Sequence, residues 1–379
     1  MRVGLNAGFL GQQGTGSGQY VRHLLGAVAE VDPSVQYLPF ARISDSGCAV
    51  SCLLAVPTPF SRRSDNLDKL WFEQVSFPQA CRHARVDVCH VPYFAPPLLS
   101  SVPVVVTIHD LIPLLLPAYR GPLWVQAYMR LVSSAARRAD QIITDSLASK
   151  NDIVERLRIP AERVHAIYLG VDPAYRPVHD DMLLTAVRAK YGLPAEFILY
   201  LGGFDQRKNL TVLLRAYRRV LETLGDKSPP LVVAGRPPPV DTQFFPDPKR
   251  IARELGIDRR VVFTGWVDEM DKPALYSAGT FLAFLSQYEG FGLMPLEAMA
   301  CGLPVLSARG SSLPEVIGDG GVLVDPTQLD AVSEAMLLLI RDAGLRQKLS
   351  ATARIQAARF DWGKTARETL RVYSLALAM

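Results

Sequence analysis

Residues 197–210 have the sequence Phe-Ile-Leu-Tyr-Leu-Gly-Gly-Phe-Asp-Gln-Arg-Lys-Asn-Leu. An apolar run is followed by two glycines, a polar loop and the start of a helix-period segment. Continuously apolar runs are typical of strands in a sheet covered on both faces, and the glycines permit the turn out of the strand. The stretch therefore predicts a strand–loop–helix unit of an α/β protein.

The same alternation extends in both directions along the chain. Short runs rich in Val, Ile, Leu and Phe alternate with longer helix-period segments, which is the pattern of parallel strands joined by crossover helices. The strand candidates are 2–6, 36–40, 86–90, 104–108 and 141–144 in the first half, and 197–202, 231–234, 261–264, 280–285, 304–306 and 321–324 in the second. We therefore expect two parallel sheets.

Length and composition fit this organisation. A chain of 379 residues accommodates two or three domains, and 49% hydrophobic with 21% charged residues exclude a largely disordered or fibrous protein. The segment from Gly170 to about Lys190 is rich in proline and polar residues, which favours a domain boundary there. We predict a first domain at 1–175, a second at 188–361 and a terminal helix at 362–379.

Net charge, cysteine spacing and hydropathy limit the kinds of partner and the cellular compartment that the sequence predicts. A net charge of +4 is too small to predict nucleic-acid binding, and five cysteines without a C-x-x-C pair predict neither a disulfide framework nor a zinc site. The N-terminus lacks the pattern of a signal peptide, and the most apolar stretch, 102–117, is too interrupted for a membrane span. These features predict a cytoplasmic protein and leave its oligomeric state open.

Two carboxylates follow the strand candidate at 280–285. The segment Glu289-Gly-Phe-Gly-Leu-Met-Pro-Leu-Glu297 places Glu289 in the loop beyond the strand, while Pro295 and Gly302 bracket a short helix that carries Glu297. Loop glycines and a helix N-terminus offer N–H groups to a phosphate. Two solvated acids would fit the same spacing, but Lys208, at the start of another helix, favours a phosphate site.

The first half has two further candidates. Gly14-Thr-Gly-Ser-Gly18 predicts an anion-tolerant loop before a helix pattern at 21–29. A dinucleotide fingerprint needs its glycines directly after a strand, whereas these begin about eight residues beyond Asn6, so NAD binding is excluded. His109 ends the strand candidate at 104–108, at the edge where α/β proteins bind ligands; structural and ligand-contacting roles are both open.

In their order and spacing, five motifs resemble those of the retaining glycosyltransferases of family 4. They are the E-x7-E element, the Gly-Gly…Arg-Lys-Asn loop, Thr107-Ile-His-Asp-Leu111, the early glycine-rich loop and Gly170-Val-Asp-Pro173. The resemblance implies the GT-B architecture, with two Rossmann-like parallel-sheet domains facing across a cleft. It also implies a nucleotide-sugar donor held mainly by the second domain, an acceptor held mainly by the first, and a C-terminal helix that crosses back to the first domain.

The resemblance further implies roles for individual residues. Glu289 would hold the transferred sugar, Lys208 would neutralise the diphosphate, and His109 would contact the sugar near the reacting carbon. Glu297 would hydrogen-bond the donor ribose. Further donor contacts would come from Gly203, Arg207, Gly265, Trp266, Val267, Gly290, Phe291, Gly292 and Leu293, and phosphate or acceptor contacts from Gly16, Ser17 and Gly18.

One departure and one absence refine the expected chemistry. Many family members have an arginine six residues before the lysine; here that position is Gly202, and Arg207 is the substitute candidate. No two aspartates are separated by one residue, so the Asp-x-Asp pair of metal-dependent transferases is missing and we predict neither a metal nor another cofactor. Retention of configuration implies that the acceptor hydroxyl attacks the face that the phosphate leaves, with a phosphate oxygen taking the proton.

The expected function is metal-independent, retaining transfer of a hexosyl group to a hydroxyl of a saccharide acceptor in surface-polysaccharide or glycan biosynthesis. Overall resemblance favours mannose from GDP-mannose as donor. The alternatives are another GT-B enzyme, such as a sugar-nucleotide epimerase or a phosphorylase, and a non-catalytic sugar-nucleotide-binding protein.

Two weaker patterns remain. The helix pattern at 124–138 combines an apolar stripe that includes Trp124 and Tyr128 with arginines at 130, 137 and 138. It fits either peripheral contact with an anionic membrane carrying a lipid-linked acceptor or an ordinary solvated basic face. Ser312-Leu-Pro-Glu315 predicts a capping box at a helix start.

Overall fold

The computed structural model describes residues 1–11, 15–43, 53–61 and 64–378. The chain forms two compact units, Met1–Gly170 with Asp361–Met379, and Val171–Phe360. The division falls at Gly170 rather than at residue 175. The predicted gap at 176–187 is part of the second unit and contains most of a helix, Asp181–Tyr191 (α7). Asp180 caps the start of this helix and Gly192 its end, but the proline-rich composition of the segment obscured these two signals.

Within its described residues, the first unit contains a parallel sheet of seven strands in the order β3-β2-β1-β4-β5-β6-β7. The strands are β1 Arg2–Asn6, β2 Gln36–Arg42, β3 Leu54–Val56, β4 Val88–Val91, β5 Val104–Thr107, β6 Gln141–Thr144 and β7 Val164–Ala166. The central strands β4, β5 and β6 are buried throughout, as expected for a sheet covered on both faces.

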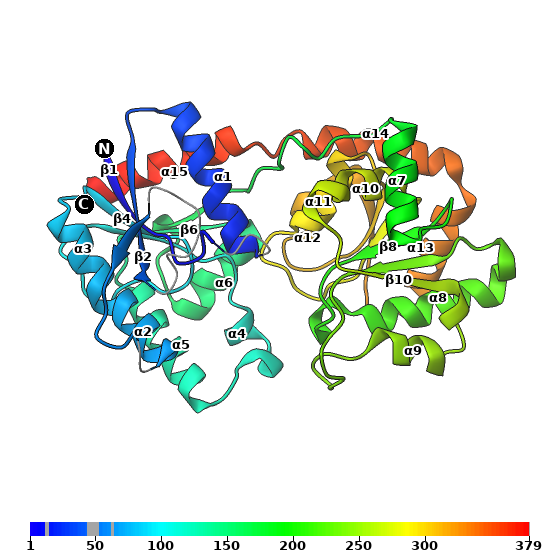
Figure 1. The fold of residues 1–379 in the computed structure, drawn as a ribbon, viewed down its shortest axis with the longest axis horizontal. Helices are drawn as coiled ribbons and strands as arrows, with labels where there is room; N and C mark the ends of the chain where they lie inside the picture. Colours follow the sequence, from blue (N-terminus) through cyan, green and yellow to red (C-terminus); the bar gives the residue numbers. More distant parts are fainter. Residues whose placement is uncertain (12–14, 44–52, 62–63, 379) are drawn as a thin grey trace. The chain divides into compact units, whose positions relative to one another are not determined.

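Helices cover both faces of this sheet (Figure 1). They are α1 Gly16–Val31, α2 Asp65–Trp71, α3 Phe77–His83, α4 Ile112–Leu115, α5 Leu123–Ala136, α6 Leu147–Leu157 and α15 Trp362–Leu377. A π-helical turn, Phe72–Ser76, links α2 to α3, and short 3₁₀ turns occupy Pro117–Tyr119 and Ala161–Arg163. None of the helices in the described ranges combines the length and apolar character that crossing a bilayer requires.

The second unit contains a parallel sheet of six strands in the order β10-β9-β8-β11-β12-β13. The strands are β8 Ile198–Leu201, β9 Leu231–Ala234, β10 Val261–Gly265, β11 Phe281–Phe284, β12 Val305–Ala308 and β13 Gly321–Val324. Besides α7, its helices are α8 Leu210–Leu224, α9 Pro248–Glu254, α10 Lys272–Ala278, α11 Leu293–Ala300, α12 Leu313–Ile317, α13 Leu329–Arg341 and α14 Ala343–Ala357. Its 3₁₀ turns are Gln206–Lys208, Gly225–Lys227, Asp258–Arg260, Glu269–Asp271 and Gly318–Gly320.

The predicted fold class is confirmed, because both units are parallel-sheet α/β domains. Every strand candidate is present within a few residues of its predicted ends. The sequence patterns missed β3 and β7, which have only three residues each and lie at the two edges of the first sheet. An edge strand of that length buries too little apolar surface to give a recognisable run.

The terminal helix α15 belongs to the first unit, as the prediction of a returning C-terminal helix required. Figure 1 shows α15 beside α1, against which it packs. Inside this unit, the Tyr373 hydroxyl lies 2.7 Å from Nδ1 of the buried His90 and 3.0 Å from the Tyr37 hydroxyl. The helix is therefore fixed to β4 and β2 by hydrogen bonds as well as by apolar contacts.

Both sheets have the strand order of doubly wound folds, in which the direction of connection reverses next to the first strand. The reversal lies between β1 and β4 in the first unit and between β8 and β11 in the second. Ligands of open α/β sheets bind outside the carboxyl ends of the strands at this point. The loops that leave β8 and β11 are therefore the first place to look for a site in the second unit.

Candidate functional site

The loops after β8 and β11 bring two cations against one carboxylate. Lys208 Nζ lies 2.6 Å from Glu289 Oε1, and Arg207 Nη1 lies 2.8 Å from the same oxygen. Arg207 also donates to the Tyr288 carbonyl oxygen at 2.6 Å. Since β8 and β11 are neighbours, residues 81 positions apart meet at the reversal point of the sheet.

This cluster is largely withdrawn from water. Lys208 is 7% exposed, and the side chain of Glu289 is 13% exposed. Burial alone would raise the pKa of Glu289, but Lys208 and Arg207 outweigh burial and hold that pKa below its ordinary value. The structure thus provides an ionised carboxylate and two cations within reach of one ligand.

The Glu289 loop is held by two serines that the sequence analysis did not connect with it. Ser311 Oγ accepts a hydrogen bond from the Glu289 N–H at 2.8 Å, and Ser312 Oγ donates to the Glu289 and Phe291 carbonyls at 2.9 and 2.6 Å. The capping-box prediction for Ser312 is therefore wrong: its hydroxyl makes no cap bond, because these carbonyls engage it instead. The two serines fix the loop that carries Glu289.

The segment Gly290 to Leu293 leads directly into α11. Gly290 and Phe291 are buried, and Gly292 has φ +119, with Leu313 Cδ2 only 3.0 Å from where a Cβ would lie. A side chain at Gly292 would therefore be strained by both backbone conformation and contact. The helix begins at Leu293, so its first N–H groups and positive dipole end follow immediately after the Glu289 loop.

Glu297 has a different environment from Glu289. It lies on α11, is 5% exposed, and its Oε2 accepts a hydrogen bond from the Tyr276 hydroxyl at 2.9 Å. Burial raises the pKa of Glu297 to about 7, although Lys272 and Tyr276 act in the opposite direction. Near neutral pH this carboxyl group is thus poised between its protonated and ionised forms.

The remaining predicted donor residues lie on the loops after β8 and β10. Gly203 is exposed and its carbonyl accepts a hydrogen bond from the Tyr200 hydroxyl. Gly265 has φ +73, Val267 is buried, and the Trp266 ring is exposed with the Arg236 guanidinium 5.3 Å from its centroid. Because β9 lies between β8 and β10, Gly203 and Gly265 are two strands apart along the sheet edge.

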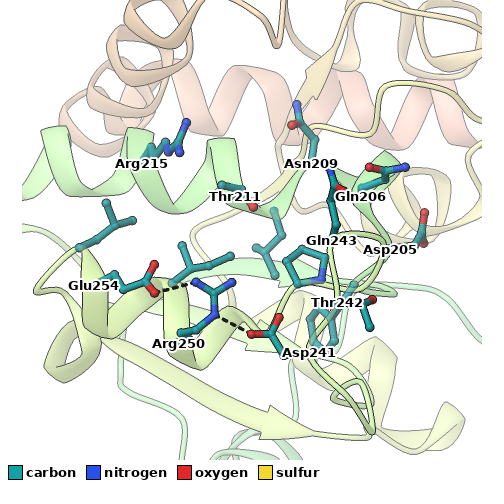
Figure 2. A pocket seen from close by; sticks show the side chains of 15 residues that line it. Asp205, Gln206, Asn209, Thr211, Arg215, Asp241, Thr242, Gln243, Arg250 and Glu254 are labelled. Atoms are coloured by element: carbon teal, nitrogen blue, oxygen red, sulfur yellow. Dashed lines mark hydrogen bonds and ion pairs between the residues drawn. The ribbon is translucent and has the colours of Figure 1, made fainter. Parts of the chain in front are cut away.

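A pocket of about 570 Å³, lined in part by Asp205, Gln206 and Asn209, lies between α8 and α9 (Figure 2). Arg250 crosses it and pairs with Asp241 at 2.6 Å and Glu254 at 2.7 Å. Neither Lys208 nor Glu289 lines this pocket. In this pocket two carboxylates hold one arginine, whereas in the Lys208–Glu289 cluster two cations share one carboxylate.

In the first unit, His109 is paired with an acid that the sequence analysis missed. His109 Nδ1 lies 2.7 Å from Asp145 Oδ2, and Nε2 lies 3.2 Å from the Pro92 carbonyl oxygen. The residues follow the neighbouring strands β5 and β6, so their side chains meet at one sheet edge. Asp145 could have been suspected as a polar residue after the strand 141–144, but strand adjacency is not visible in the sequence.

The partners of His109 determine its protonation. A carboxylate and a carbonyl oxygen only accept hydrogen bonds, so two donating N–H groups require the imidazolium. Burial alone would lower the pKa of His109, but Asp145 outweighs it and the pKa is raised. His90 shows the opposite case: its ring nitrogens face the Tyr373 and Thr107 hydroxyls, and burial lowers its pKa to about 3.

The predicted glycine-rich loop of the first unit is in fact a helix start. Gly16, Ser17 and Gly18 form the first turn of α1, and the Thr15 hydroxyl caps it by accepting from the Gly18 N–H at 3.1 Å. Gly14 lies outside the described residues. The space beside Gly16 is unfilled, since a Cβ there would meet no atom within 4 Å. The prediction of a loop failed because Thr15 capping outweighs the poor helix propensity of glycine.

The comparisons with known proteins agree with this fold. Residues 14–175 match the family model Glycosyltransferase Family 4, and residues 186–356 match Glycosyl transferases group 1. The chain is 33% identical over 299 residues to O-antigen chain mannosyltransferase B of Escherichia coli, covering 78% of this chain and 76% of that one. The chain belongs to glycosyltransferase family 4.

Two further likenesses place this family member. It is 34% identical over 262 residues to the serotype-specific mannosyltransferase WbdA of Escherichia coli. The matched region covers 68% of this chain and 32% of WbdA. Sucrose-phosphate synthase from Thermosynechococcus elongatus has the same fold, with a TM-score of 0.78 at 20% identity over 100% of this chain and 99% of that one. This family member is therefore a hexosyltransferase.

Proposed function

We propose that this glycosyltransferase is a mannosyltransferase that uses GDP-mannose, retains the anomeric configuration and needs no metal. The choice of mannose rests on the two mannosyltransferases to which the chain is similar. The placement of the chemistry rests on one observation, the meeting of Lys208, Arg207 and Glu289 at the reversal point of the second sheet.

The cluster suits a diphosphate donor. Departure of a nucleoside diphosphate places negative charge on its phosphate oxygens, and fixed cations at that position lower the barrier. Lys208 and Arg207 would bind those oxygens, with the first N–H groups of α11 nearby in the same edge of the sheet. Arg207 would thereby replace the arginine that the family usually has six residues before the lysine. These groups supply the positive charge that a divalent metal supplies in Asp-x-Asp transferases.

Glu289 would have two successive partners. Within the protein it neutralises Lys208 and Arg207. A bound diphosphate would compete for both cations and leave Glu289 free to accept hydrogen bonds from the sugar hydroxyls. The same exchange would couple occupation of the phosphate site to orientation of the sugar.

In the proposed mechanism, the residue that the first unit contributes is His109. With Nδ1 held by Asp145, the Nε2–H would exchange its 3.2 Å contact with the Pro92 carbonyl for an oxygen of the transferred sugar near the reacting carbon. The acceptor hydroxyl would attack the face that the phosphate leaves, and a phosphate oxygen would take its proton. We further propose that the acceptor is a saccharide carried on a lipid and that the enzyme, a cytoplasmic protein, meets it at the membrane surface through α5.

Three measurements test this function. Purified enzyme is incubated with GDP-mannose and other nucleotide sugars, with and without saccharide acceptors, and nucleotide release is followed. Release that depends on acceptor and is greatest with GDP-mannose supports the proposal; acceptor-independent epimerisation, phosphorolysis or binding without turnover contradicts it. An inverted linkage in the product, or loss of activity in EDTA that a divalent metal restores, would refute retention or metal independence separately.

A further inference from the structure

A fully buried carboxyl group, outside the residues used above, lies next to the reversal point of the first sheet. It belongs to Glu73, on the π-helical turn Phe72–Ser76. Glu73 Oε1 accepts a hydrogen bond from the Tyr93 hydroxyl at 3.1 Å, and Oε2 accepts one from the Tyr128 hydroxyl at 2.8 Å. Tyr93 follows β4, one of the two strands at the reversal point. The carboxylate therefore holds a residue at the edge where ligands of such sheets bind.

Tyr93 connects this carboxylate to the loop that follows β1. Asn6, the last residue of β1, donates from Nδ2 to the Tyr93 hydroxyl at 2.9 Å. Asn6 Oδ1 accepts a hydrogen bond from the Gly8 N–H at 3.2 Å. The Phe9 ring meets the Tyr93 ring edge-on, with 4.7 Å between the ring centroids. Three successive hydrogen bonds and one ring contact thus link Glu73 to the backbone of Gly8 and the side chain of Phe9.

Each group in this hydrogen-bond chain has one possible role. An ionised carboxylate only accepts hydrogen bonds, so the Tyr93 O–H points to Glu73 and its oxygen is left to accept from Asn6. The amide nitrogen of Asn6 therefore faces Tyr93, and its carbonyl oxygen faces the Gly8 N–H. The reversed amide would place two donors against each other at Gly8. The charge on Glu73 thus determines how Asn6 holds the loop.

The charged carboxyl group is costly to keep at this position. Burial raises the pKa of Glu73, although Lys69 and hydrogen bonds from the two tyrosines act in the opposite direction. Lys69 Nζ lies 3.8 Å from Glu73 Oε1, and it is also 5.9 and 5.5 Å from the ring centroids of Tyr93 and Tyr128. Apolar residues of the same volume commonly stabilise a fold as well as a buried ion pair does. Packing alone therefore does not account for Glu73, and π-helical turns such as the one that carries it are frequent at functional sites.

We propose that Glu73 is a positioning residue for acceptor binding, acting through Tyr93 and Asn6 on Gly8 and Phe9. Glu73 itself is fully buried and would touch no substrate. The half-buried Phe9 would pack its ring against the C–H face of a pyranose unit of the acceptor. This inference rests on the proposed transfer to a saccharide acceptor.

The test compares Tyr93→Phe with Tyr128→Phe, since each removes one donor from the same carboxylate but only Tyr93 leads on to Asn6. With the nucleotide sugar that gives the fastest acceptor-dependent turnover, Tyr93→Phe should raise the acceptor KM about 5- to 10-fold, the effect of one net hydrogen bond. The donor KM should stay within about twofold of the parent's. Tyr128→Phe should raise the acceptor KM clearly less. The matched control is Tyr217→Phe, which removes a buried hydroxyl from α8 in the second unit and should leave both KM values within about twofold.

Hydrogen exchange at the Gly8 amide is a second readout that needs no turnover. Exchange should be faster in Tyr93→Phe and unchanged in Tyr217→Phe, whereas Phe9→Leu should raise the acceptor KM without faster exchange. Unchanged exchange in Tyr93→Phe, equal KM effects of Tyr93→Phe and Tyr128→Phe, or an unchanged acceptor KM in Phe9→Leu would overturn the inference. Absence of acceptor-dependent turnover in the parent would refute the proposed function, whereas normal parent turnover with an unchanged acceptor KM in Tyr93→Phe would refute this inference alone.

Discussion

The two units share an order of strands but place different chemistry at the carboxyl edge of their sheets. In the second unit, the neighbours β8 and β11 lead to Lys208 and Glu289, an ionised pair. In the first, the corresponding neighbours β1 and β4 lead to Asn6 and Tyr93, which are hydrogen-bonded at 2.9 Å. The order of the strands determines where a ligand can bind, and the residues at the strand ends and in the loops that follow determine the chemistry of the site.

The ionised pair of the first unit lies further along its sheet edge. His109 and Asp145 follow β5 and β6, beyond the reversal point. The second unit thus presents two cations to an anion, whereas the first presents one histidine held by the Asp145 carboxylate and the Pro92 carbonyl. Two cations at the carboxyl edge of the second sheet suit the diphosphate of the proposed donor.

The largest expected effect is that of Glu289→Gln. Glutamine keeps one acceptor oxygen but loses the negative charge, so the proposed hydrogen bonds from the sugar hydroxyls weaken; we expect kcat/KM to fall about 100- to 1000-fold, as for loss of one preorganised transition-state contact. GDP should bind as tightly as before or more tightly, because Lys208 and Arg207 lose their internal competitor. Steady-state kinetics and calorimetric titration with GDP measure the two quantities.

The control for Glu289→Gln is Glu254→Gln, which makes the same charge change on α9. Turnover of the control should stay within about twofold of the parent, as for a surface substitution. If Glu289→Gln also retains turnover, or if it loses GDP binding in parallel, the assigned exchange between carboxylate and diphosphate is wrong.

Asp145→Asn tests the corresponding pair of the first unit. An amide cannot stabilise the imidazolium as a carboxylate does, so the pKa of His109 should fall from its raised value and kcat should drop about 10- to 100-fold, the equivalent of one hydrogen bond to a charged group. Ring ¹⁵N shifts followed against pH measure the pKa without any turnover. Asp145→Glu should restore part of both losses; an unchanged His109 pKa would show that Asp145 has no positioning role.

Much of the fold could be predicted because long apolar strands and glycine-bearing loops report on local structure. Burial on both faces gives β4, β5, β6, β8, β9 and β11 an unbroken apolar run. The short edge strands β3 and β7 lack that signal. The helix α7 buries only Val187, so its periodicity is weak and its segment resembled a linker.

Candidate site residues could be selected from the sequence where the signal lies within one short segment. Glu289 and Glu297 share a segment, and Lys208 follows a strand-and-glycine pattern, so each could be selected from the sequence. Asp145 and Ser312 act across the fold, on His109 and on the Glu289 loop, through contacts that depend on strand order and packing. Local rules even misassigned Ser312, because its motif fits a cap that tertiary hydrogen bonds replace.

Glu297→Gln tests the difference between the two glutamates, since the pKa of Glu297 is raised whereas that of Glu289 is lowered. The pKa of Glu297 is raised to about 7 in the folded protein, so its contribution to stability is present at low pH and is lost as pH rises from about 4.5 through about 7. The total is up to about 3 kcal/mol. Denaturant unfolding should show the variant gaining on the parent between pH 5 and pH 8.

Glu297 should also make donor binding depend on pH. Donor binding should improve as pH rises, whereas the contribution of Glu297 to stability falls. Ionised Glu297 accepts hydrogen bonds from ribose hydroxyls better than the protonated form, so the parent's KM for the donor should fall as pH rises through about 7. Glu297→Gln should remove this pH dependence at a cost of a few fold in KM. A parent KM that is flat across this range would separate Glu297 from the ribose.

The smallest effect on activity is expected for Tyr373→Phe. This substitution tests the uncharged hydrogen bonds that link Tyr37, Tyr373 and His90 in the first unit, rather than the His109–Asp145 pair. The substitution leaves buried His90 and the Tyr37 hydroxyl without their partner, which costs about 1–3 kcal/mol and lowers Tm by a few degrees. Tyr37→Phe removes one hydroxyl from the same chain but leaves the Tyr373–His90 bond intact, so it should cost less. Equal losses in the two variants would mean that the His90 contact does not hold α15, whereas a turnover change beyond a few fold would mean that this chain reaches the chemistry of His109.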